Sequence, residues 1–535
     1  MNLLESLTDN IVIDKDKCTF CGICVERCVL DNLRMKLAPC RQACPLGVNC
    51  HGYVQLIARG EEARAMELLL ETLPFPGILG RICSQPCEEF CYHKTMDGEA
   101  VAVRALKRYL ADQVSVGERP LPEVAKETGR KVAIVGSGPA GLMAAYHLRI
   151  RGHSVEIFES ENEPGGMLRW AIPEFRLPQN IVEEEISLLK KLGVQFSCGV
   201  FIGKDKTLED LKEAYQAVII ATGCPQHTGL NIKGEALPGV YHGLPFLNGI
   251  RKGKKPETGG KVIVIGGGNV AVDAAQTALR LGAEDVSMVC LESAGEIPAF
   301  SWTLKGALSE GIELFDGWGP VQFTSEKGVL KGIEFQRCLG VFDRKGDFNP
   351  RFDPNDRMSL EADMAIVAIG QHPDLRWLEK FGLAKGTKME VDPLTLQTSD
   401  EKIFLAGDLV KGPSSVIEAM AGGKESAESA HRYVSGQPIS YGRAYEGPVE
   451  TDFEIDTSKG ADFQRIEIRE QHFQGKGDFL EVEQPLDVAS ARQEAGRCYS
   501  CGQPFGKYRT CWFCLPCEVD CPHEALWVEI PYLLR

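Results

Sequence analysis

The amino-acid sequence predicts an α/β protein with two similar strand-and-helix units, to which cysteine-rich regions are attached. Residues 131–159 and 261–292 each contain an apolar strand, a glycine-rich turn, a helix and a second strand. Sixteen of the 20 cysteines lie in three short regions outside these units. Because a domain usually has about 100 to 200 residues, a chain of 535 residues is expected to form three or four of them.

The composition is that of a globular protein and excludes several functional classes. Hydrophobic residues make up 44% and charged residues 25% of the chain, close to the averages of folded domains. The formal net charge of −16 argues against nucleic acid as a ligand, because a basic face supplies most of the affinity for it. We find no apolar run of about 18 residues and no signal peptide. We expect a cytoplasmic protein without a membrane span.

The first cysteine region has the spacing of a bacterial ferredoxin. Its four cysteines are separated by two, two and three residues: Cys18, Cys21, Cys24 and Cys28. One loop with this spacing wraps three thiolates around a 4Fe-4S cluster, and in two-cluster ferredoxins the fourth cysteine ligates the other cluster. Val29 replaces the proline that usually follows the fourth cysteine. We expect residues 1–35 to be a ferredoxin-like 4Fe-4S segment.

A second copy of this spacing lies near the C-terminus, preceded by a further cysteine pair. The cysteines of this region are Cys498, Cys501, Cys511, Cys514, Cys517 and Cys521. Pro522 follows the last of them, as in ferredoxins. We expect residues 441–535 to be a C-terminal ferredoxin-like 4Fe-4S segment with at least one cluster. The alternative at both ends is a zinc site, since paired Cys-x2-Cys motifs bind zinc through four thiolates, but continuous triplets favour a cluster.

Two cysteine triplets lie before and after a predicted helical stretch at about 52–73. They are Cys40, Cys44 and Cys50, and Cys83, Cys87 and Cys91. A three-residue spacing places thiolates on one face of a helical turn, which predicts an α-helical iron–sulfur domain at 36–125. Six thiolates exceed one set of four and fall short of two. The chain is expected to hold two to four clusters, and four would require cysteines shared between regions or a non-cysteine ligand. Alternatively, some of the six are buried, unligated thiols.

The first strand-and-helix unit has the features of a Rossmann-like dinucleotide site. Gly136, Gly138 and Gly141 form a Gly-x-Gly-x-x-Gly turn between strand and helix. Without side chains there, backbone N–H groups approach a pyrophosphate at the helix N-terminus. Glu159 closes the second strand and is placed to accept hydrogen bonds from ribose hydroxyls.

The second unit repeats this pattern, with Gly266, Gly268 and Ala271 in the three motif positions. Alanine is accepted in the third position, where helix and strand need only pack closely. Glu292 stands near the end of the second strand, where a carboxylate binds a ribose diol and repels a 2′-phosphate. This favours NADH over NADPH. The alternative is that Glu292 is a solvated loop charge.

Three further apolar strands end in glycine. The first two, 217–223 and 364–370, are expected to be the returning strands of the two units. The third, 403–409, ends in Gly407 and Asp408 ahead of a predicted helix, where an acid is positioned to hold flavin ribityl or phosphate groups. We therefore expect one dinucleotide domain to be split around the other. The first is predicted at 130–255 and 365–440, and the inserted one at 256–364.

From about residue 40 to 434 the chain resembles the glutamate synthase small subunit family. Besides the glycine turns, the motifs that carry the resemblance are PCRQACPLG (39–47), GRICSQPCEEFC (80–91), PGGMLRWAIPEFRLP (164–178) and LAGDLVKGPSSVIEAM (405–420). The resemblance implies FAD on the first Rossmann-like unit, NAD(P)H on the second, and iron–sulfur clusters in the helical domain. Both ferredoxin-like ends are additions to the family pattern.

The resemblance also implies site residues. Those for FAD are Gly136, Gly138, Gly141, Glu159, Gly166, Met167 and Asp408; those for the nicotinamide nucleotide are Gly266, Gly268, Asn269 and Val270. We also expect cofactor contacts from Pro139, Ala140, Gly223, Glu292, Gly370 and Gly407. The chain departs from the family in two ways. Leu291 and Glu292 replace the arginine pair of NADPH-using members, and Cys50 is extra while the usual Cys-x2-Cys before residue 39 is missing.

These features predict an electron-transferring flavoprotein subunit. FAD takes a hydride from reduced nicotinamide and releases electrons singly to clusters, so no catalytic side chain is required. Disulfide reduction is rejected, because no cysteine pair lies between Cys91 and Cys198. The remaining cysteines, expected to be core thiols, are Cys198, Cys224, Cys290 and Cys338.

The expected partner is ferredoxin or a subunit of a hydrogenase, a formate dehydrogenase or an electron-bifurcating complex. The alternative is a non-catalytic iron–sulfur scaffold that retains the Rossmann-like units only for their shape.

Overall fold

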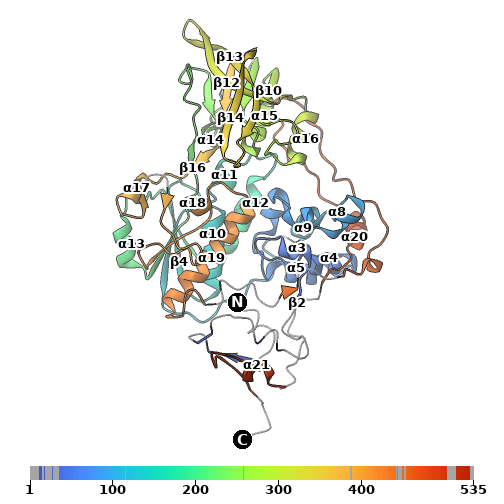
Figure 1. Ribbon diagram of the computed structural model, residues 1–535, viewed down its shortest axis with the longest axis vertical. Coiled ribbons are helices and arrows are strands. Elements are labelled where there is room, and N and C mark those ends of the chain that lie inside the picture. Colours follow the sequence, from blue (N-terminus) through green and yellow to red (C-terminus); the bar gives the residue numbers. More distant parts are fainter. Residues whose placement is uncertain are drawn as a thin grey trace.

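The computed structural model describes residues 11–14, 17–18, 24, 27, 35–114, 116–256, 258, 260–385, 388–441, 443, 449–450, 454–502 and 514–529. Three predicted metal ligands, Cys21, Cys28 and Cys511, lie outside them. Within the described ranges, a helical domain and a first sheet lie side by side, a second sheet lies beyond them at one end, and α21 lies at the opposite end (Figure 1).

The helical domain occupies the region expected at 36–125. Its helices are α3 (Pro39–Gln42), α4 (Cys50–Ala58), α5 (Glu62–Leu70), α6 (Pro76–Ile82), α7 (Pro86–Glu89), α8 (Tyr92–Asp97) and α9 (Val103–Gln113). The single helix expected at about 52–73 is two helices, because Gly60 between them adopts a φ of +73° that a helix does not allow. Asn49 caps the first of the two by accepting a hydrogen bond from Gly52 N.

The first sheet is parallel and has the strand order β19-β6-β3-β4-β5. Its strands are β3 (Lys131–Val135), β4 (Ser154–Glu159), β5 (Gln195–Cys198), β6 (Ala217–Ile220) and β19 (Ile403–Leu405). The central strand β3 and its neighbour β6 are largely apolar and buried on both faces, as parallel sheets require.

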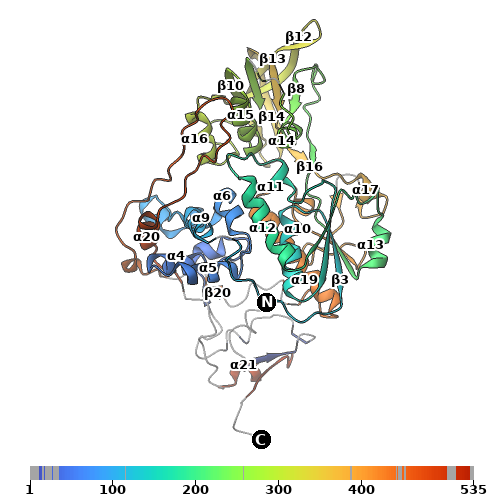
Figure 2. The ribbon, with the colours of Figure 1, turned by 180° about the vertical axis from the view of Figure 1, so that it is seen from behind.

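Helices cover both faces of this sheet. They are α10 (Pro139–Ile150), α11 (Met167–Trp170), α12 (Gln179–Lys191), α13 (Leu208–Ala214), α17 (Arg376–Glu379), α18 (Asp408–Lys411) and α19 (Val416–Val434). Helices α10, α12 and α19 lie between the sheet and the helical domain (Figures 1 and 2). Glycine allows α10 and α19 to touch, since a Cβ on Gly423 would lie 2.1 Å from the carbonyl oxygen of Ala140.

The second sheet is also parallel, with the order β11-β10-β9-β15-β8. Its strands are β8 (Val240–His242), β9 (Lys261–Ile265), β10 (Asp285–Val289), β11 (Glu313–Phe315) and β15 (Met364–Val367), and its helices are α14 (Gly243–Arg251), α15 (Asn269–Leu281) and α16 (Ser301–Ser309). An antiparallel sheet of β12 (Trp318–Glu326), β13 (Val329–Phe342) and β14 (Phe348–Glu361) packs against it.

The domain boundaries differ from those expected at 256 and 364. Strand β8 pairs with β15, and β15 pairs with β9, so the second domain includes both of these outer segments. The crossing between the domains is made by β7 (Gln226–His227) and β16 (Gln371–His372), which pair with each other. The insertion is therefore about 228–370, because the returning strand completes the second sheet just as β6 completes the first. Two further short strands, β17 (Ala384–Lys385) and β18 (Lys388–Met389), form a hairpin.

The C-terminal region expected as one segment at 441–535 has two structurally separate parts. Residues 454–502, which we call the strap, contain η1 (Thr457–Lys459) and α20 (Val488–Gly496). They contact the helical domain at Arg465, pass α15 of the second domain at Gly477 and return to the helical domain at Glu483 (Figures 1 and 2). Residues 514–529 contain α21 (Pro516–Val519) and β21 (Leu526–Val528). A parallel bridge joins β2 (Met35–Lys36) to β20 (Val449–Glu450).

The two ends of the described chain meet. Strand β1 (Ile11–Ile13) pairs antiparallel with β21, with Ile11 opposite Val528. Apolar side chains of both strands form a small core with which Cys18, Cys24, Cys517 and Cys521 are packed. The expected segment 1–35 is thus not independent of the C-terminal one.

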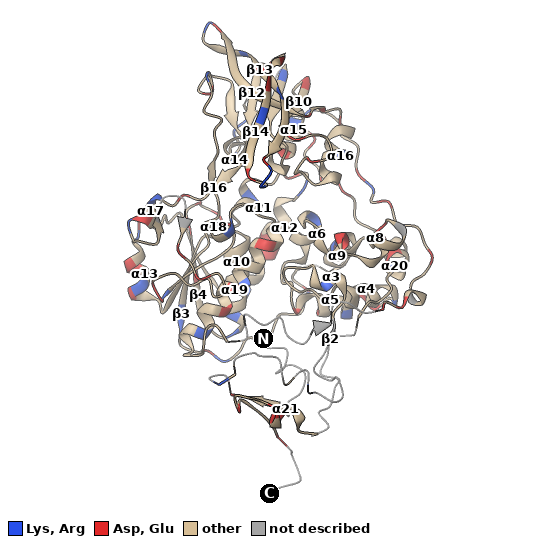
Figure 3. Cartoon of the chain, viewed as in Figure 1, with Lys and Arg blue, Asp and Glu red and all other residues tan. Residues whose placement is uncertain are grey.

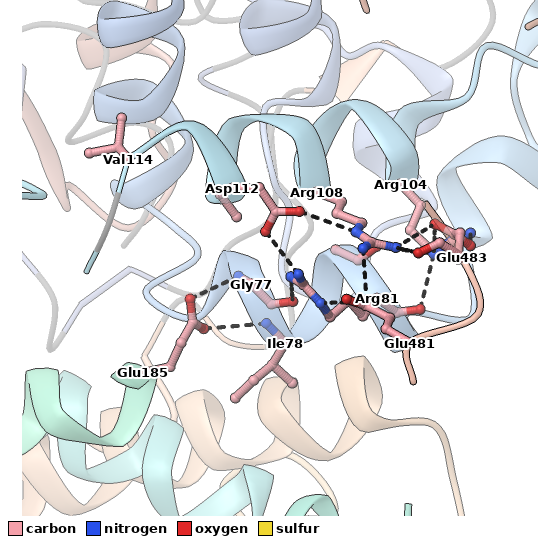
Figure 4. Close-up of polar contacts among 12 residues, drawn as sticks. Gly77, Ile78, Arg81, Arg104, Arg108, Asp112, Val114, Glu185, Glu481 and Glu483 are labelled. Atoms are coloured by element: carbon pink, nitrogen blue, oxygen red, sulfur yellow. Dashed lines mark hydrogen bonds and ion pairs between the residues drawn. The ribbon is translucent and has the colours of Figure 1, made fainter. Parts of the chain in front are cut away.

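Ion pairs buried from solvent fix the strap to α6 and α9 (Figure 4). The side chains of Arg81, Arg104 and Arg108 are 3–7% exposed and contact Glu481 and Glu483 of the strap. Paired charges of this kind replace the water that the arginines lose on burial. Elsewhere Lys and Arg alternate with Asp and Glu over each part of the fold, without a wholly basic region among the residues drawn in colour (Figure 3).

A second buried ion pair joins the helical domain to the first sheet. Glu185 of α12 accepts hydrogen bonds from Arg119, 2.7 Å away, and from Gly77 N, 2.8 Å away. The side chains of Glu185 and Arg119 are 1% and 8% exposed. Burial raises the pKa of Glu185, and Arg119 opposes that rise.

We expect Arg119→Ala to lower the free energy of unfolding by about 3–5 kcal/mol near neutral pH, because Glu185 is left as a buried, unpaired charge. In this variant the folded-state pKa of Glu185 lies further above its unfolded value. The stability deficit should therefore shrink as the pH falls toward the ordinary glutamate pKa. Thermal unfolding at pH 8 and pH 5 measures both effects. Glu361→Ala, which removes the exposed ion pair with Lys261, is the control and should change little.

Candidate functional site

Both glycine turns open onto one cavity of ≈ 1500 Å³. A single ligand usually occupies about 300–1,000 Å³, so this cavity has room for two dinucleotides. Fifteen of the seventeen predicted cofactor residues line it: Gly136, Gly138, Pro139, Ala140, Glu159, Gly166, Met167, Gly223, Gly266, Gly268, Asn269, Val270, Glu292, Gly370 and Asp408. Gly141 and Gly407 are not among its lining residues.

The first turn is held by close backbone packing. Gly136 has a φ of +105°, and a Cβ on it would lie 2.4 Å from the carbonyl oxygen of Ala221 at the end of β6. A Cβ on Gly141 would lie 2.0 Å from the carbonyl oxygen of Gly136. Gly138, in contrast, faces open space at the N-terminus of α10. The turn therefore presents bare backbone and the positive end of a helix dipole to the cavity.

The carboxylate of Glu159 organises this turn from the end of β4. It accepts hydrogen bonds from Ser137 N at 3.0 Å and from Glu161 N at 2.9 Å, and it also binds the Ser137 hydroxyl. Ser137 Oγ in turn accepts a hydrogen bond from Gly165 N at 2.9 Å. Glu159 thus links the turn to the segment that begins with Gly166. Sequence reasoning missed Ser137, because a variable position of the motif gives no signal for this contact.

Asp408 begins α18 on another side of the cavity. Its carboxylate accepts a hydrogen bond from Ser414 Oγ at 2.6 Å. Burial raises the pKa of Asp408, and the hydrogen bonds of Ser414 oppose that rise. Helix α19 starts directly after it with a capping box of Ser415 and Glu418. The predicted acid therefore lies at the cavity between two helix N-termini.

The second turn repeats the geometry of the first. Gly266 has a φ of +139°, and a Cβ on it would lie 2.3 Å from the carbonyl oxygen of Ala368, which follows β15. Asn269 Oδ1 accepts hydrogen bonds from Phe300 N at 3.1 Å and Thr303 Oγ1 at 3.0 Å. This amide thereby holds the segment after residue 298 beside the turn, where Phe300 lines the cavity.

The described side chains around the second turn are acidic rather than basic. A Cβ on Gly267 would lie 3.0 Å from Glu292 Oε2, so the carboxylate lies directly beside the turn. Among the cavity-lining residues that the structure describes, Arg176 is the only Lys or Arg. Arg176 already binds Asp273 of α15 at 2.7 and 2.9 Å.

The cavity wall also contains buried polar atoms that a ligand would satisfy. Trp170 Nε1 and Gln371 Oε1 are buried and have no hydrogen-bond partner in the described part of the chain. Both residues line the cavity. Together with the side-chain-free turns, these atoms fit a bound flavin and nicotinamide. Neither was among the predicted site residues, although Trp170 lies within the motif at 164–178 and Gln371 follows the predicted Gly370.

The scattered cysteines are only partly the core thiols that were expected. Cys224 and Cys290 are buried and line the cavity, and burial raises the pKa of each thiol to about 12. Cys198 and Cys338 are only partly buried. The two cavity cysteines belong to the first and the second unit respectively, and neither forms a disulfide in the described part of the chain.

Eight of the predicted cluster cysteines lie in or against the helical domain. The hydrogen bond with Cys50, followed by the influence of His51, lowers the pKa of the Cys40 thiol to about 5, although burial raises it. Lys107 of α9 is buried, which disfavours its charge, but Cys83, Cys87, Cys44 and Cys50 together raise its pKa. Sequence reasoning missed this lysine, which occupies a helix face that was not predicted to contact thiols.

The spacing of these cysteines favours a cluster over zinc. In the described ranges, no three His, Cys, Asp or Glu side chains are grouped around the position of one metal ion. Four thiolates on one zinc ion all lie at about 2.3 Å from it, whereas a cubane binds each thiolate through a different iron and needs a wider set.

Among the described residues, no helix combines the length and apolar character needed to cross a bilayer.

Two family descriptions match the chain. Residues 130–423 match pyridine nucleotide-disulphide oxidoreductase, and residues 10–118 match dihydropyrimidine dehydrogenase domain II, 4Fe-4S cluster. The chain is 35% identical to the NADP(+)-dependent formate dehydrogenase subunit beta of Moorella thermoacetica, over 87% of this chain and 70% of the relative. It is 31% identical to the NAD-dependent dihydropyrimidine dehydrogenase subunit PreT of Escherichia coli K12, over 75% and 92%. It is 30% identical to the glutamate synthase [NADPH] small chain of Azospirillum brasilense, over 74% and 86%.

We expect Gly136→Ala to reduce the FAD content of the purified protein about tenfold or more. A side chain at this φ costs about 1–2 kcal/mol, and its contact with the Ala221 carbonyl also forces the turn away from β6. FAD is released by denaturation and measured by absorbance per mole of protein. Gly306→Ala is the matched control, because a Cβ there meets no atom within 4 Å. An undiminished FAD content in Gly136→Ala would contradict the assignment of the turn.

Proposed function

Because the chain belongs to the family of NAD(P)H-dependent FAD and iron–sulfur oxidoreductases that includes the glutamate synthase small chain, we propose that it transfers electrons between NADH, FAD, 4Fe-4S clusters and a partner protein. The resemblance found in the sequence is thereby confirmed. The partner and the number of clusters are part of the proposal.

The observation that supports this function best is that the helical domain forms part of the cavity wall. Ala43, Pro45, Ile82, Ser84 and Pro86 line the same cavity as the first glycine turn. Each of them is a chain neighbour of Cys44, Cys83 or Cys87. A cluster held by these three cysteines would therefore lie beside the flavin, where single-electron transfer requires it.

When bound in this cavity, FAD would accept a hydride from reduced nicotinamide and release its two electrons singly to clusters. The side chains of the chain have the task of placing the two cofactors. The turns at Gly138 and Gly268 hold the pyrophosphates, Asp408 binds a polar part of the flavin, and Trp170 and Gln371 offer one donor and one acceptor. No side chain needs to exchange a proton with the substrate.

The first glycine turn is proposed to bind FAD and the second NADH. Glu292 would accept hydrogen bonds from the 2′- and 3′-hydroxyls of the ribose and repel a 2′-phosphate. The relatives from Moorella and Azospirillum are named for NADP and NADPH, whereas the Escherichia relative is NAD-dependent. The carboxylate over the turn supports the NAD-dependent choice for this chain.

The two ends of the chain are proposed to form a single ferredoxin-like domain with two clusters. The pairing of β1 with β21 supports this, as does the packing of Cys18, Cys24, Cys517 and Cys521 around that pair. The fourth cysteine of each ferredoxin motif ligates the cluster of the other. Such a domain would deliver electrons to a partner, for which the formate dehydrogenase beta subunit among the relatives suggests a redox complex. A free ferredoxin or a hydrogenase would also accept electrons from such a domain.

The proposed function is tested by anaerobic titration of the cluster-loaded protein with NADH and, separately, with NADPH. Flavin and iron–sulfur absorbance are followed together. We expect NADH to bleach both chromophores at a far lower concentration than NADPH. If neither nucleotide reduces the flavin while dithionite does, the chain is an iron–sulfur scaffold and the proposed function fails.

We expect the double substitution Leu291→Arg and Glu292→Arg to shift the ratio of kcat/KM for NADPH over NADH about tenfold or more toward NADPH. Two guanidinium groups would bind the 2′-phosphate that the present carboxylate repels. Dye reduction by the holoprotein measures the ratio. The control is Glu296→Gln on the same loop, whose exposed side chain accepts a hydrogen bond from Ser293 Oγ at 2.7 Å. A double variant that keeps the wild-type ratio would rule out this position as the ribose site.

A further inference from the structure

We infer that the strap brings Cys498 and Cys501 into the helical domain, where they complete a set of four cluster ligands with Cys40 and Cys91, and that Cys50 completes a second set with Cys44, Cys83 and Cys87. We call these the outer set and the inner set. The inference rests on the proposed function, because it assigns cysteines to the clusters of that function. It differs from the sequence expectation that the pair belongs to a C-terminal ferredoxin-like segment.

The strap is anchored next to the pair by two fully buried residues. Glu494, 0% exposed, accepts hydrogen bonds from Ala102 N at 2.8 Å and from Ile466 N at 2.9 Å. Arg497, 1% exposed, binds Glu494 and donates to the carbonyl oxygens of Ala100 and Glu99. The chain therefore enters the cysteine pair from a rigid position on the helical domain.

Side chains of two helices contact Cys498 and the residues on either side of it. Gln55 Nε2 of α4 donates to the carbonyl oxygen of Cys498 at 2.8 Å. His93 contacts the carbonyl oxygen of Arg497 and stacks on Tyr499 with ring centroids 3.9 Å apart. These contacts tie the pair to α4 and α8, the helices nearest Cys50 and Cys91 in the chain.

A small cavity of ≈ 30 Å³ lies where these elements meet. Its lining includes five cysteines, Cys40, Cys50, Cys91, Cys498 and Cys501. They come from three regions of the chain that are far apart in sequence. Cys44, Cys83 and Cys87 do not line this cavity, and their chain neighbours line the flavin cavity instead. The fifth lining cysteine, Cys50, is therefore available as the fourth member of the inner set.

The inner set is marked by a buried cation. Lys107 is 4% exposed, and its charge interacts with Cys44, Cys50, Cys83 and Cys87. Its ammonium group lies 3.4 Å from the carbonyl oxygen of Leu79. Burying an ammonium group is costly unless polar or charged groups lie close to it, and here the cysteines of the inner set lie near it. With Cys50 counted here, each set has four thiolates.

The backbone between the cysteines has the strain expected of ligand loops. Seven non-glycine residues in the described part of the chain have a positive φ. Three of them lie between two cysteines: Gln85 at 61°, Ser500 at 55° and Leu515 at 68°. Residues held in such backbone conformations cluster at functional sites. Ser500 N also donates to Cys498 Sγ at 3.4 Å, a hydrogen bond of the kind that tunes cluster potentials.

Sixteen cysteines then supply four complete sets. The helical domain and the strap provide eight thiolates, and the ferredoxin-like ends provide the other eight. The missing Cys-x2-Cys before residue 39 is replaced by Cys498 and Cys501, and the extra Cys50 makes a non-cysteine ligand unnecessary. The inner set adjoins the flavin cavity, and the outer set lies next to the inner set. Electrons that leave the flavin would therefore reach the inner cluster first and the outer cluster second.

The inference is tested on the full-length holoprotein, purified without oxygen, by counting iron and acid-labile sulfide per FAD. EPR spectra of dithionite-reduced samples identify which cluster is lost. We expect Cys498→Ser, and separately Cys91→Ser, to lose up to four irons or to convert one cubane to a three-iron cluster. Cys338→Ser on β13 is the control and should retain all iron.

Double variants decide which cysteines share a cluster. Cys91→Ser with Cys498→Ser should lose no more iron than either single variant, whereas Cys83→Ser with Cys498→Ser should lose about twice as much. Cys50→Ser should behave as an inner-set variant, additive with Cys498→Ser but not with Cys83→Ser. Each variant is accepted when its FAD content equals that of the wild type. If Cys498→Ser fails this criterion, Cys91→Ser combined with Cys501→Ser makes the same comparison.

Two outcomes would overturn the inference. One is a full iron content in Cys498→Ser. The other concerns additivity: the iron lost in Cys498→Ser would add to the loss in Cys91→Ser but not to the loss in Cys514→Ser. Cys498 and Cys501 would then ligate a cluster of the terminal ferredoxin-like domain. Reduction of the wild-type flavin by NADH is recorded in parallel. Its failure would overturn the proposed function without changing the iron counts, so the two failures are distinguishable.

Discussion

The return of the strap to the helical domain is the constraint on which the rest of the structure depends. The carboxylate of Glu494 is removed from water and satisfied by two backbone N–H groups and Arg497, so loss of any partner would leave a buried charge. The ion pairs of Arg104 and Arg108 with Glu483 fix the strap a second time. With the chain held at both places, Cys498 and Cys501 lie against the helical domain, whereas Cys517 and Cys521 lie with β1 and β21 in the terminal part.

The same strap also positions the inserted domain. Arg280 of α15 is 1% exposed, forms an ion pair with Glu310 and packs against the rings of Phe175 and Phe473. Phe473 belongs to the strap, and Phe175 belongs to the first dinucleotide domain. Because Gly477 N also donates to the carbonyl oxygen of Arg280 at 2.7 Å, the strap links the insertion to the helical domain. The strap therefore holds the two dinucleotide domains in position on either side of the cavity that lies between the glycine turns.

The sequence predicts those features that depend on neighbours in the chain. Glycine turns, flanking apolar strands and the acids Glu159 and Asp408 have fixed spacings, and the structure brings all of them to one cavity region. Features that depend on distant segments were missed. The spacing at Cys498 and Cys501 could not reveal that a helical domain about 400 residues earlier receives them, because the contacts that decide this are made by Gln55, Glu494 and Arg497. The insertion boundaries were wrong for a related reason, since strand pairing rather than composition defines a sheet.

The proposed preference for NADH illustrates why a family's name for its substrate does not transfer as a whole. The backbone of the second turn is common to NADH and NADPH, since it binds only the pyrophosphate. Discrimination between the two nucleotides depends on the charge beside the ribose. Here Glu292 lies beside the turn, and Arg176, the one Lys or Arg among the described lining residues, is already paired with Asp273. A single surface loop can thus change the electron donor while the flavin, the inner cysteines and the strap remain as they are. In the proposed function, the part of the chain that selects the electron donor is separate from the part that distributes the electrons.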